Sequence, residues 1–393
     1  MPERLLLSLR KFVAPEFVFG RGAVALAGRQ AAGLGVRRAL LVADPGLFAF
    51  GWPDKVATSL VAAGIEPRLF SALSSNPRDV EVMAGAKLFD ESGCDALVAV
   101  GGGSAMDCAK AIGIVSANRR HILEFEGVDN VDRPGPPIVC VPTTAGTGAD
   151  VSQFVIVTDT ARRVKVAIAS KMLIPDASLI DPEVTATMPR ELSVHTGLDA
   201  LTHAVEAYVS NAHGPMTDLL ALEAVRLIRL NLPRVLVDPG NIDARGGMCL
   251  ASLYAGMALS NAILGAVHAM AHSLGGLLDL PHGLCNAILL DHVVRYNYDA
   301  VADRYVTLGR LLGARFDDDA PDAEKKESVV AAIADFRTSL GLRLNLADLG
   351  VSPEAIPELA RKAMADPCLL TNPREASQSD LEAIYENARR ATS

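Results

Sequence analysis

The stretch "DALVAVGGGSAMDCAK" (residues 95–110) decides the fold. Its apolar run predicts a buried strand, the three glycines and the serine predict a turn, and the remainder has helical spacing. Such a turn lets a backbone approach a phosphate, and the N–H groups at the start of the following helix can then bind that phosphate. Because the glycines do not follow the usual G-x-G-x-x-G pattern, an ordinary tight turn is an equally good interpretation of this stretch alone.

The same strand–turn–helix pattern occurs on both sides of this stretch. The segment "PPIVCVPTTAGTG" (136–148) again places a glycine-rich turn after an apolar run, and it adds the hydroxyls of Thr143 and Thr144. Strands that alternate with helices predict a parallel, doubly wound sheet. Residues 153–159 and 163–170 predict a hairpin added to that sheet. Further strands are expected at 38–44 and 66–72, and helices at 55–64, 79–92 (with Asp79 as its N-cap) and 105–117.

Almost all of the chain beyond residue 185 has helical periodicity. We therefore predict an α/β dinucleotide-binding domain over residues 1–185 and an all-α metal-binding domain over 186–393. Residues 247–267 carry no charge and are long enough to cross a bilayer, but their many Ala, Gly and Ser residues favour a buried central helix. The expected helices are 196–210, 214–230, 243–264, 266–278, 286–298, 322–340 and 378–391.

The composition excludes several classes of partner and location. The net charge is −9 and no block of Lys and Arg occurs, which argues against nucleic acid and anionic membranes as partners. The six cysteines are scattered without a CxxC pair, as expected for reduced thiols in the cytoplasm. The apolar run at the N-terminus is too short for a signal peptide. We therefore predict a cytoplasmic protein.

Histidines gather in the apolar segment "HAMAHSLGGLLDLPHG" (268–283). His268 and His272 are four residues apart, as are Asp199 and His203, so each pair shares one helix face. His282 follows in what is predicted to be a loop. Burying three imidazoles without partners would cost about 1–3 kcal/mol each, so histidines with an aspartate predict a site for Fe²⁺, Zn²⁺ or Co²⁺.

Such a cation is a Lewis acid for the oxygen of an alcohol or carbonyl compound. A zinc peptidase is a poor alternative, because that motif needs a glutamate directly after the first histidine and Ala269 stands there. Asp44 ends the first strong strand. A carboxylate there suits the ribose hydroxyls of NAD and repels the 2′-phosphate of NADP, although a helix cap is the alternative role.

Motifs along nearly the whole chain resemble the iron-dependent, or group III, alcohol dehydrogenases. They are "FVFGRGAV", "GGGSAMD", "PTTAGTGADVS", "DASLIDP", "TGLDALTHAVEAYVS", "HAMAHSLGG…PHGLCNAILL" and "TNPR", in this order. The resemblance implies a nucleotide-binding α/β domain, a helical domain, an active site in the cleft between them, and a homodimer. The chain departs from the family at Ala149–Ser152, where Ser-Glu-Val-Thr is frequent.

Position by position, the resemblance implies a role for individual residues. The metal ligands would be Asp199, His203, His268 and His282. His272 would lie near the nicotinamide and act catalytically, as a relay for the alcohol proton. The NAD contacts would be Asp44, Asn76, Gly102, Gly103, Ser104, Asp107, Thr143, Thr144, Ser152 and Lys165.

We therefore predict an NAD-dependent alcohol dehydrogenase that uses Fe²⁺, or Zn²⁺ or another divalent ion, and interconverts a small primary alcohol and its aldehyde by hydride transfer. Phe154, Leu259 and Cys368 are expected to line an apolar substrate cleft. Strand pairing of residues 11–20 between two copies would form the homodimer. The alternative is a regulatory or sensory protein that retains the fold with weak or no turnover.

Overall fold

The computed structural model describes residues 11–390, which form two compact units. The α/β unit consists of Val13–Pro189 and Gly240–Cys249. The helical unit contains Arg190–Pro239 and the described residues from Leu250 onward. The domain boundary near residue 185 stays a prediction. Each unit is described by itself below.

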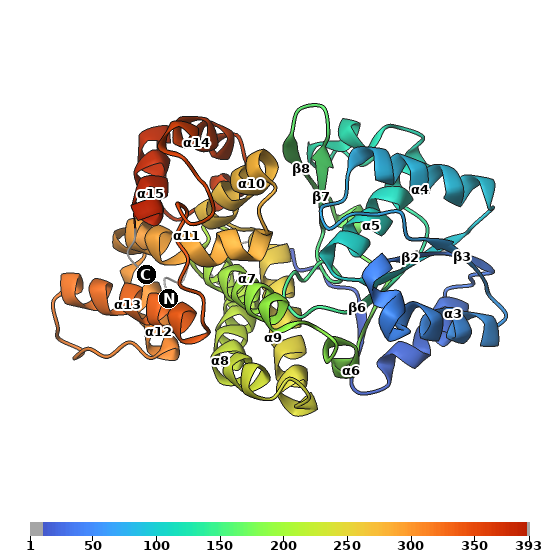
Figure 1. The fold of residues 1–393 in the computed structure, drawn as a ribbon, viewed down its shortest axis with the longest axis horizontal. Coiled ribbons are helices and arrows are strands. Elements are labelled where there is room, and N and C mark those ends of the chain that lie inside the picture. The colour runs from blue at the N-terminus through green and yellow to red at the C-terminus, as the bar shows by residue number, and fades with distance from the viewer. Residues whose placement is uncertain (1–10, 391–393) are drawn as a thin grey trace. The chain divides into compact units, whose positions relative to one another are not determined.

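A six-stranded sheet forms the centre of the α/β unit (Figure 1). Its order is β1-β9-β6-β4-β2-β3, and every neighbouring pair is parallel, which confirms the predicted sheet. The strands are β1 Glu16–Phe19, β2 Arg38–Ala43, β3 Glu66–Phe70, β4 Ala96–Gly101, β6 Ile138–Pro142 and β9 Ala177–Ile180.

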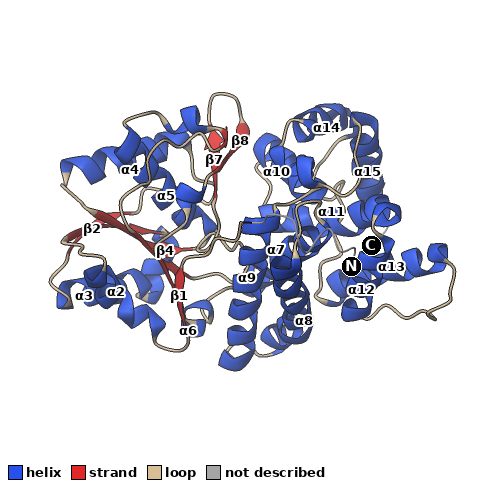
Figure 2. Ribbon diagram, turned by 180° about the vertical axis from the view of Figure 1, so that it is seen from behind, coloured by secondary structure: helices blue, strands red, loops and turns tan. Residues whose placement is uncertain are grey.

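Both faces of this sheet are covered by helices (Figure 2). Along β4, Leu97 and Ala99 contribute to one apolar core, whereas Ala96, Val98 and Val100 contribute to the other. This alternation follows from the pleat, and burial on both faces explains why the strand is apolar throughout. The first core is shared with α4 Asp79–Glu91 and α5 Gly103–Asn118, and the second with α2 Ala27–Gly33 and α3 Trp52–Ala62.

The predicted hairpin is confirmed, but its predicted position in the main sheet is wrong. Strands β7 Phe154–Asp159 and β8 Val164–Ala169 are antiparallel and belong to a separate three-stranded sheet. The other edge of β8 pairs with β5 Gly127–Val128, while the edge of β6 in the main sheet is taken by β9. The hairpin therefore builds its own layer beside α5.

The prediction that Asp79 is the N-cap of α4 is wrong. Arg78 is the N-cap, and Asp79 is the first residue of the helix. The carboxylate of Asp79 instead accepts a hydrogen bond from Thr160 Oγ1 at 2.9 Å, which joins α4 to the end of β7. The short helix α6 Pro182–Thr185 completes the unit, with Asp181 as its N-cap.

The helical unit contains longer helices, and α11 packs against both α7 and α10. His282 is the first residue of α11, so its predicted position in a loop is wrong. Helices α12 and α14 were not predicted, because they are short and lie in charged sequence. The helices are α7 Arg190–Val209, α8 Pro215–Val237, α9 Ile242–Ala262, α10 Ala266–Leu278, α11 His282–Asn297, α12 Ala302–Leu312, α13 Asp322–Ser339, α14 Ile356–Met364 and α15 Gln378–Arg390.

A sharp bend of 100° separates α9 from α10. Ile263 lies at the bend with φ 62°, a left-handed conformation that is rare for a β-branched residue. The carbonyl oxygens on either side of Ile263 accept hydrogen bonds from side chains. Ser210 Oγ donates to Ala262 O (2.5 Å), and Thr371 Oγ1 donates to Leu264 O (2.6 Å). Over residues 11–390, no single helix meets the length and hydropathy needed to cross a membrane. Helices α9 and α10 meet that requirement only as this bent pair.

Candidate active site

Three helices of the helical unit bring a carboxylate and three imidazoles together. Asp199 and His203 lie one turn apart on α7, His268 lies on α10, and His282 begins α11. The Oδ1 atom of Asp199 is 3.8 Å from His203 Nε2, 3.8 Å from His268 Nε2 and 3.7 Å from His282 Nε2. Asp199, His203 and His268 are buried. The ligand atoms of Asp199, His268 and His282 all lie within 4.8 Å of one another, and His203 joins them through its contact with Asp199.

Gly283 explains how α11 comes this close to α7. A Cβ atom at this position would lie 2.4 Å from the carbonyl oxygen of His195, on α7. No side chain larger than hydrogen fits at that distance without moving one of the helices. The glycine after His282 therefore fixes the approach that places this imidazole beside Asp199.

The four atoms suit a divalent cation of the Fe²⁺ or Zn²⁺ type. Bonds of about 2.0–2.2 Å place neighbouring ligand atoms roughly 3–4 Å apart, which matches the separations around Asp199 Oδ1. Burial lowers the pKa of His268 to about 3, although the charge of Asp199 acts in the opposite direction. This imidazole is therefore neutral and has a lone pair to donate, as a metal ligand must.

Glu206 orients His268, and the sequence analysis missed it. Its Oε2 atom lies 2.5 Å from His268 Nδ1, while Oε1 accepts from the Val267 N–H at 2.7 Å. Burial raises the pKa of Glu206 to about 7, opposed by the N–H groups of Val267 and Gly265. An ionised Glu206 holds the imidazole proton on Nδ1 and leaves Nε2 directed at Asp199. The available signal was its position, three residues after His203 on the same helix.

His272 has a different environment from the four predicted ligands. Its Nδ1 atom lies 2.7 Å from Asp366 Oδ2, and its ring stacks on that of His282 with centroids 5.2 Å apart. Burial acts to raise the pKa of Asp366, but His272 and the Cys368 N–H hold it below its usual value. An ionised Asp366 fixes the His272 proton on Nδ1, which leaves Nε2 as a proton acceptor. Sequence reasoning did not find Asp366.

Six of the ten predicted NAD residues directly follow the carboxyl ends of β2, β4 and β6: Asp44, Gly102, Gly103, Ser104, Thr143 and Thr144. The chain order reverses between β2 and β4, and ligands of doubly wound sheets bind at such a point. Asp44 follows β2, and Gly102 is the N-cap of α5 directly after β4. The N–H of Thr143 donates to Gly101 O at 2.9 Å, so the two glycine-rich turns lie side by side.

Two glycines in these turns allow the close approach. A Cβ on Gly102 would lie 3.2 Å from the methyl of Thr144, and one on Gly103 would lie 3.0 Å from that of Thr147. The backbone at the start of α5 therefore stays uncovered by side chains of its own. Such a cradle fits the pyrophosphate of a dinucleotide.

Other predicted NAD residues have contacts within the protein. Asp44 accepts from the Gly46 N–H at 2.8 Å, so the alternative role as a cap is present. Asp107 accepts from the Ile156 N–H at 3.1 Å, and the buried Ser152 carbonyl accepts from Lys110 Nζ at 2.8 Å. The hydroxyl of Ser104 donates to the Ser75 carbonyl, and Lys165 Nζ donates to Asn76 Oδ1 at 2.9 Å. Their roles towards NAD stay predictions.

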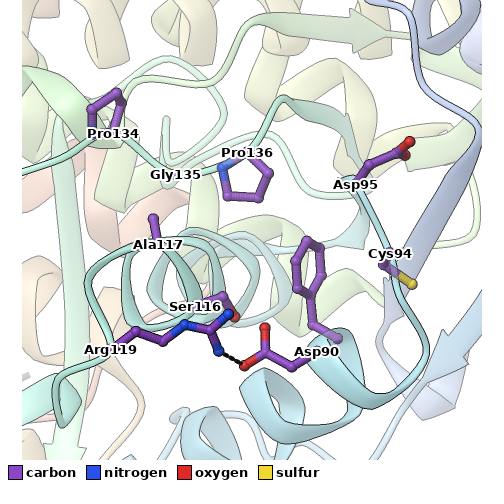
Figure 3. A pocket seen from close by; sticks show the side chains of 10 residues that line it. Asp90, Cys94, Asp95, Ser116, Ala117, Arg119, Pro134, Gly135 and Pro136 are labelled. Atoms are coloured by element: carbon purple, nitrogen blue, oxygen red, sulfur yellow. Dashed lines mark hydrogen bonds and ion pairs between the residues drawn. The ribbon is translucent and has the colours of Figure 1, made fainter.

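A pocket with a volume of about 390 Å³ lies in the α/β unit, and Figure 3 shows the residues that line it. It adjoins the amino ends of β4 and β6, where Arg119 forms an ion pair with Asp90. None of the predicted site residues lines it. Its lining residues are Phe89, Asp90, Cys94, Asp95, Ser116, Ala117, Arg119, Pro134, Gly135 and Pro136.

Two family models together match almost the whole chain. Residues 14–182 match the iron-containing alcohol dehydrogenase model, and residues 193–389 match the C-terminal model of the Fe-containing alcohol dehydrogenase family. The chain belongs to the iron-containing alcohol dehydrogenase family. It is an oxidoreductase, and both compact units have their counterpart in this family.

Relatives within the iron-containing alcohol dehydrogenases are similar over their full length. The NAD-dependent methanol dehydrogenase of Bacillus methanolicus is 37% identical, with 96% of this chain and 99% of the relative covered. The 1,3-propanediol dehydrogenase of Klebsiella pneumoniae is 41% identical, with 94% and 96% covered. The crystal structure of a 1,3-propanediol oxidoreductase has a TM-score of 0.93 at 40% identity, covering 97% of this chain and 100% of the other.

Proposed function

We propose that the chain is an NAD- and divalent-metal-dependent alcohol dehydrogenase that interconverts a small primary alcohol and its aldehyde, with Fe²⁺ as the metal. The observation that carries the proposal is the convergence of three imidazole nitrogens on one carboxylate oxygen of Asp199, at 3.7–3.8 Å. The names of the methanol and 1,3-propanediol relatives support a small alcohol as substrate.

Asp199, His203, His268 and His282 would hold the metal. The cation, when bound, supplies a Lewis acid that lowers the pKa of the alcohol hydroxyl. Three neutral imidazoles and one carboxylate leave a divalent cation with net positive charge, so the site keeps its attraction for a developing negative charge on oxygen. Glu206 keeps His268 in the tautomer that binds metal.

His272 would take up the alcohol proton at Nε2. Its Nδ1–H donates to Asp366, so the carboxylate orients the ring and stabilises the imidazolium that forms. The His272 ring stacks on that of His282 and therefore lies beside the proposed ligands, but we propose that it is not a ligand itself. We therefore assign His272 the role of general base and Asp366 the role of positioning residue.

NAD would accept the hydride while the glycine-rich turns hold its pyrophosphate at the start of α5. Asp44, at the end of β2, would bind the adenosine ribose. This combination of glycines and an acid at the reversal of strand order supports a dinucleotide. The remaining proposed contacts are Asn76, Gly102, Gly103, Ser104, Asp107, Thr143, Thr144, Ser152 and Lys165.

The test is NADH formation by purified protein that has been stripped of metal and reconstituted with Fe²⁺ or Zn²⁺, across a panel of short alcohols. We expect turnover with metal, and none for His268→Ala or His282→Ala. Full turnover of a protein that mass spectrometry shows to be metal-free would overturn the proposal. Tight NAD binding without turnover, with any metal, would favour the regulatory alternative, against which the complete ligand set argues.

A homodimer is also part of the proposal. Strand β1 lies at the edge of the main sheet, where Phe17 and Phe19 are about 40% exposed. Unpaired edge strands with apolar side chains are templates for pairing with another chain. Analytical ultracentrifugation tests this, because a monomer at micromolar concentration would contradict it.

All six cysteines are free, which supports the proposed cytoplasmic location.

A further inference from the structure

Asn286 lies among the predicted metal ligands, although it was not predicted from the sequence. It follows His282 by one turn of α11, and its side chain is fully buried. Its amide nitrogen is 2.6 Å from Asp199 Oδ1, 3.0 Å from His268 Nε2 and 3.2 Å from His282 Nε2. One amide group thus contacts three of the four ligand side chains at the atoms that would bind the metal.

The contacts with Asp199 and His268 have the same polarity. Asp199 Oδ1 is a carboxylate oxygen, and His268 Nε2 carries a lone pair because Glu206 holds the imidazole proton on Nδ1. The amide nitrogen presents two hydrogens, and therefore the positive end of the amide dipole, to this group of acceptors. The amide oxygen of Asn286 is buried and has no hydrogen-bond partner among the described residues.

A bound cation cannot coexist with this orientation. A metal uses the same lone pairs that the amide hydrogens accept, and those hydrogens would then face a positive charge. Turning the amide by half a rotation about its last side-chain bond exchanges nitrogen for oxygen without moving the helix. This torsion is broad and roughly two-fold in asparagine, and an amide oxygen is a normal ligand for a divalent cation.

We propose that Asn286 is a two-position residue of the metal centre, which donates its N–H groups to the ligands in the metal-free protein and turns its oxygen to the cation on loading. This rests on the proposed metal site. In the first position the amide keeps mutually repelling acceptors together. In the second position its oxygen gains the partner that it lacks in the first and acts as a further ligand. The second position favours metal binding, and its gain exceeds the cost of breaking the hydrogen bonds of the first.

Two substitutions separate the two positions. Asn286→Leu removes both the donor and the oxygen, so we expect metal affinity to fall by about 10–100-fold, the usual loss for a supporting residue of a metal site. Asn286→Asp keeps an oxygen for the cation but places a second carboxylate beside Asp199. We expect the metal-free variant to melt at a lower temperature than the metal-free wild type. The metal-loaded variant should melt at the same temperature as the metal-loaded wild type.

The measurements use the full-length protein after metal removal. Affinity for Co²⁺ and Zn²⁺ is measured by competition with a coloured chelator, melting temperature is measured with and without Zn²⁺, and the visible spectrum of bound Co²⁺ reports coordination number. We expect Asn286→Leu to shift the Co²⁺ spectrum towards the stronger absorption of four-coordinate sites. The matched control is Asn231→Leu. This buried amide on α8 bonds, among residues 11–390, only within its own helix, to Leu227 O and the Arg234 side chain. It should leave metal affinity unchanged.

Failure of this inference differs from failure of the proposed function. If the wild type binds no divalent cation tightly, or if His282→Ala binds it as well as the wild type, the metal site itself is wrong. If the wild type binds metal and Asn286→Leu binds it equally or more tightly, the amide only competes with the cation and this inference is overturned. An Asn286→Asp protein whose metal-free form melts like the wild type would contradict the first position, even if the leucine variant does not fold.

Discussion

At the scale of single residues, the site depends on where protons are held. Glu206 and Asp366 each accept from the Nδ1 side of a histidine, His268 and His272 respectively. The two histidines are one turn apart on α10, yet one faces Asp199 and the other lies against Cys368 and Asp366. The carboxylate partner, more than the spacing, distinguishes a proposed ligand from a proposed general base.

This difference predicts the effect of Glu206→Gln. The glutamine side chain has one oxygen and one NH₂ group. If its oxygen accepts from Val267, its NH₂ faces His268 Nδ1 and forces the imidazole proton to Nε2, where it blocks metal binding. The opposite orientation sets NH₂ against the N–H of Val267. We expect metal affinity to fall by about 10–100-fold in a chelator competition assay.

Asp366→Asn is the control for this variant, since it makes the same chemical change at His272. It should impair turnover and leave metal affinity within a few-fold of the wild type. Equal losses of metal affinity in both variants would mean that the carboxylates contribute only to packing around α10.

The sequence predicted the residues that bind but not those that orient them. Spacing of four residues showed that Asp199 and His203 share a helix face. The partners of His268 and His272, by contrast, are 62 and 94 residues away in the chain. Asp366 becomes recognisable only when the chain folds, because no spacing links it to His272, whereas Glu206 and Asn286 lie one helical turn from His203 and His282.

At the scale of elements, the contact between α11 and α7 places His282. Gly283→Ala tests it, because the new methyl would lie 2.4 Å from the His195 carbonyl oxygen and the helices would have to separate. We expect a loss of about 1–3 kcal/mol in the free energy of unfolding, together with weaker metal binding. Chemical denaturation and a chelator titration measure the two effects.

Gly246→Ala is the matched control on α9. A methyl there would lie 3.6 Å from Pro182, which is an ordinary contact. Alanine is also the better helix former by about 1 kcal/mol. This variant should therefore be as stable as the wild type or more so. A Gly283→Ala protein that behaves in the same way would show that α11 can shift without disturbing the site.

Helices and strands could be predicted where their burial requires a clear pattern of apolar residues in the sequence. Strands β2, β4 and β6 are apolar runs because helices cover both faces of the sheet. The four-residue strand β9 and the nine-residue helix α14 are too short for a pattern to stand out. Whether the β7–β8 hairpin joins the main sheet depends on which strand pairs with the edge of β6. The local sequence of the hairpin does not determine which strand this is.

At the scale of the whole molecule, buried histidine makes stability depend on pH. His292 lies on α11, and burial lowers its pKa; Asp291 acts to raise it, whereas Arg337 and Arg295 also lower it. In the unfolded chain His292 has its ordinary pKa of about 6.5. Below that pH the unfolded chain binds a proton at His292, whereas the folded protein does not. His292 therefore lowers the free energy of unfolding as the pH falls.

We therefore expect His292→Gln to flatten the acid limb of the stability profile. Melting temperatures of the wild type and the variant, both kept metal-free with chelator, are compared between pH 7 and pH 5. The wild type should lose more stability over this interval than the variant. Parallel profiles would show that the folded protein accommodates the protonated imidazole without cost.

The bend at Ile263 offers an opportunity for protein engineering. A residue held in this unfavourable conformation costs of order 1–3 kcal/mol, whereas glycine adopts it freely. The hydroxyls of Ser210 and Thr371 already hold the flanking carbonyls in place. A designer who wants a heat-resistant catalyst can therefore relieve the backbone here, read the gain from a melting curve, and leave every ligand atom untouched.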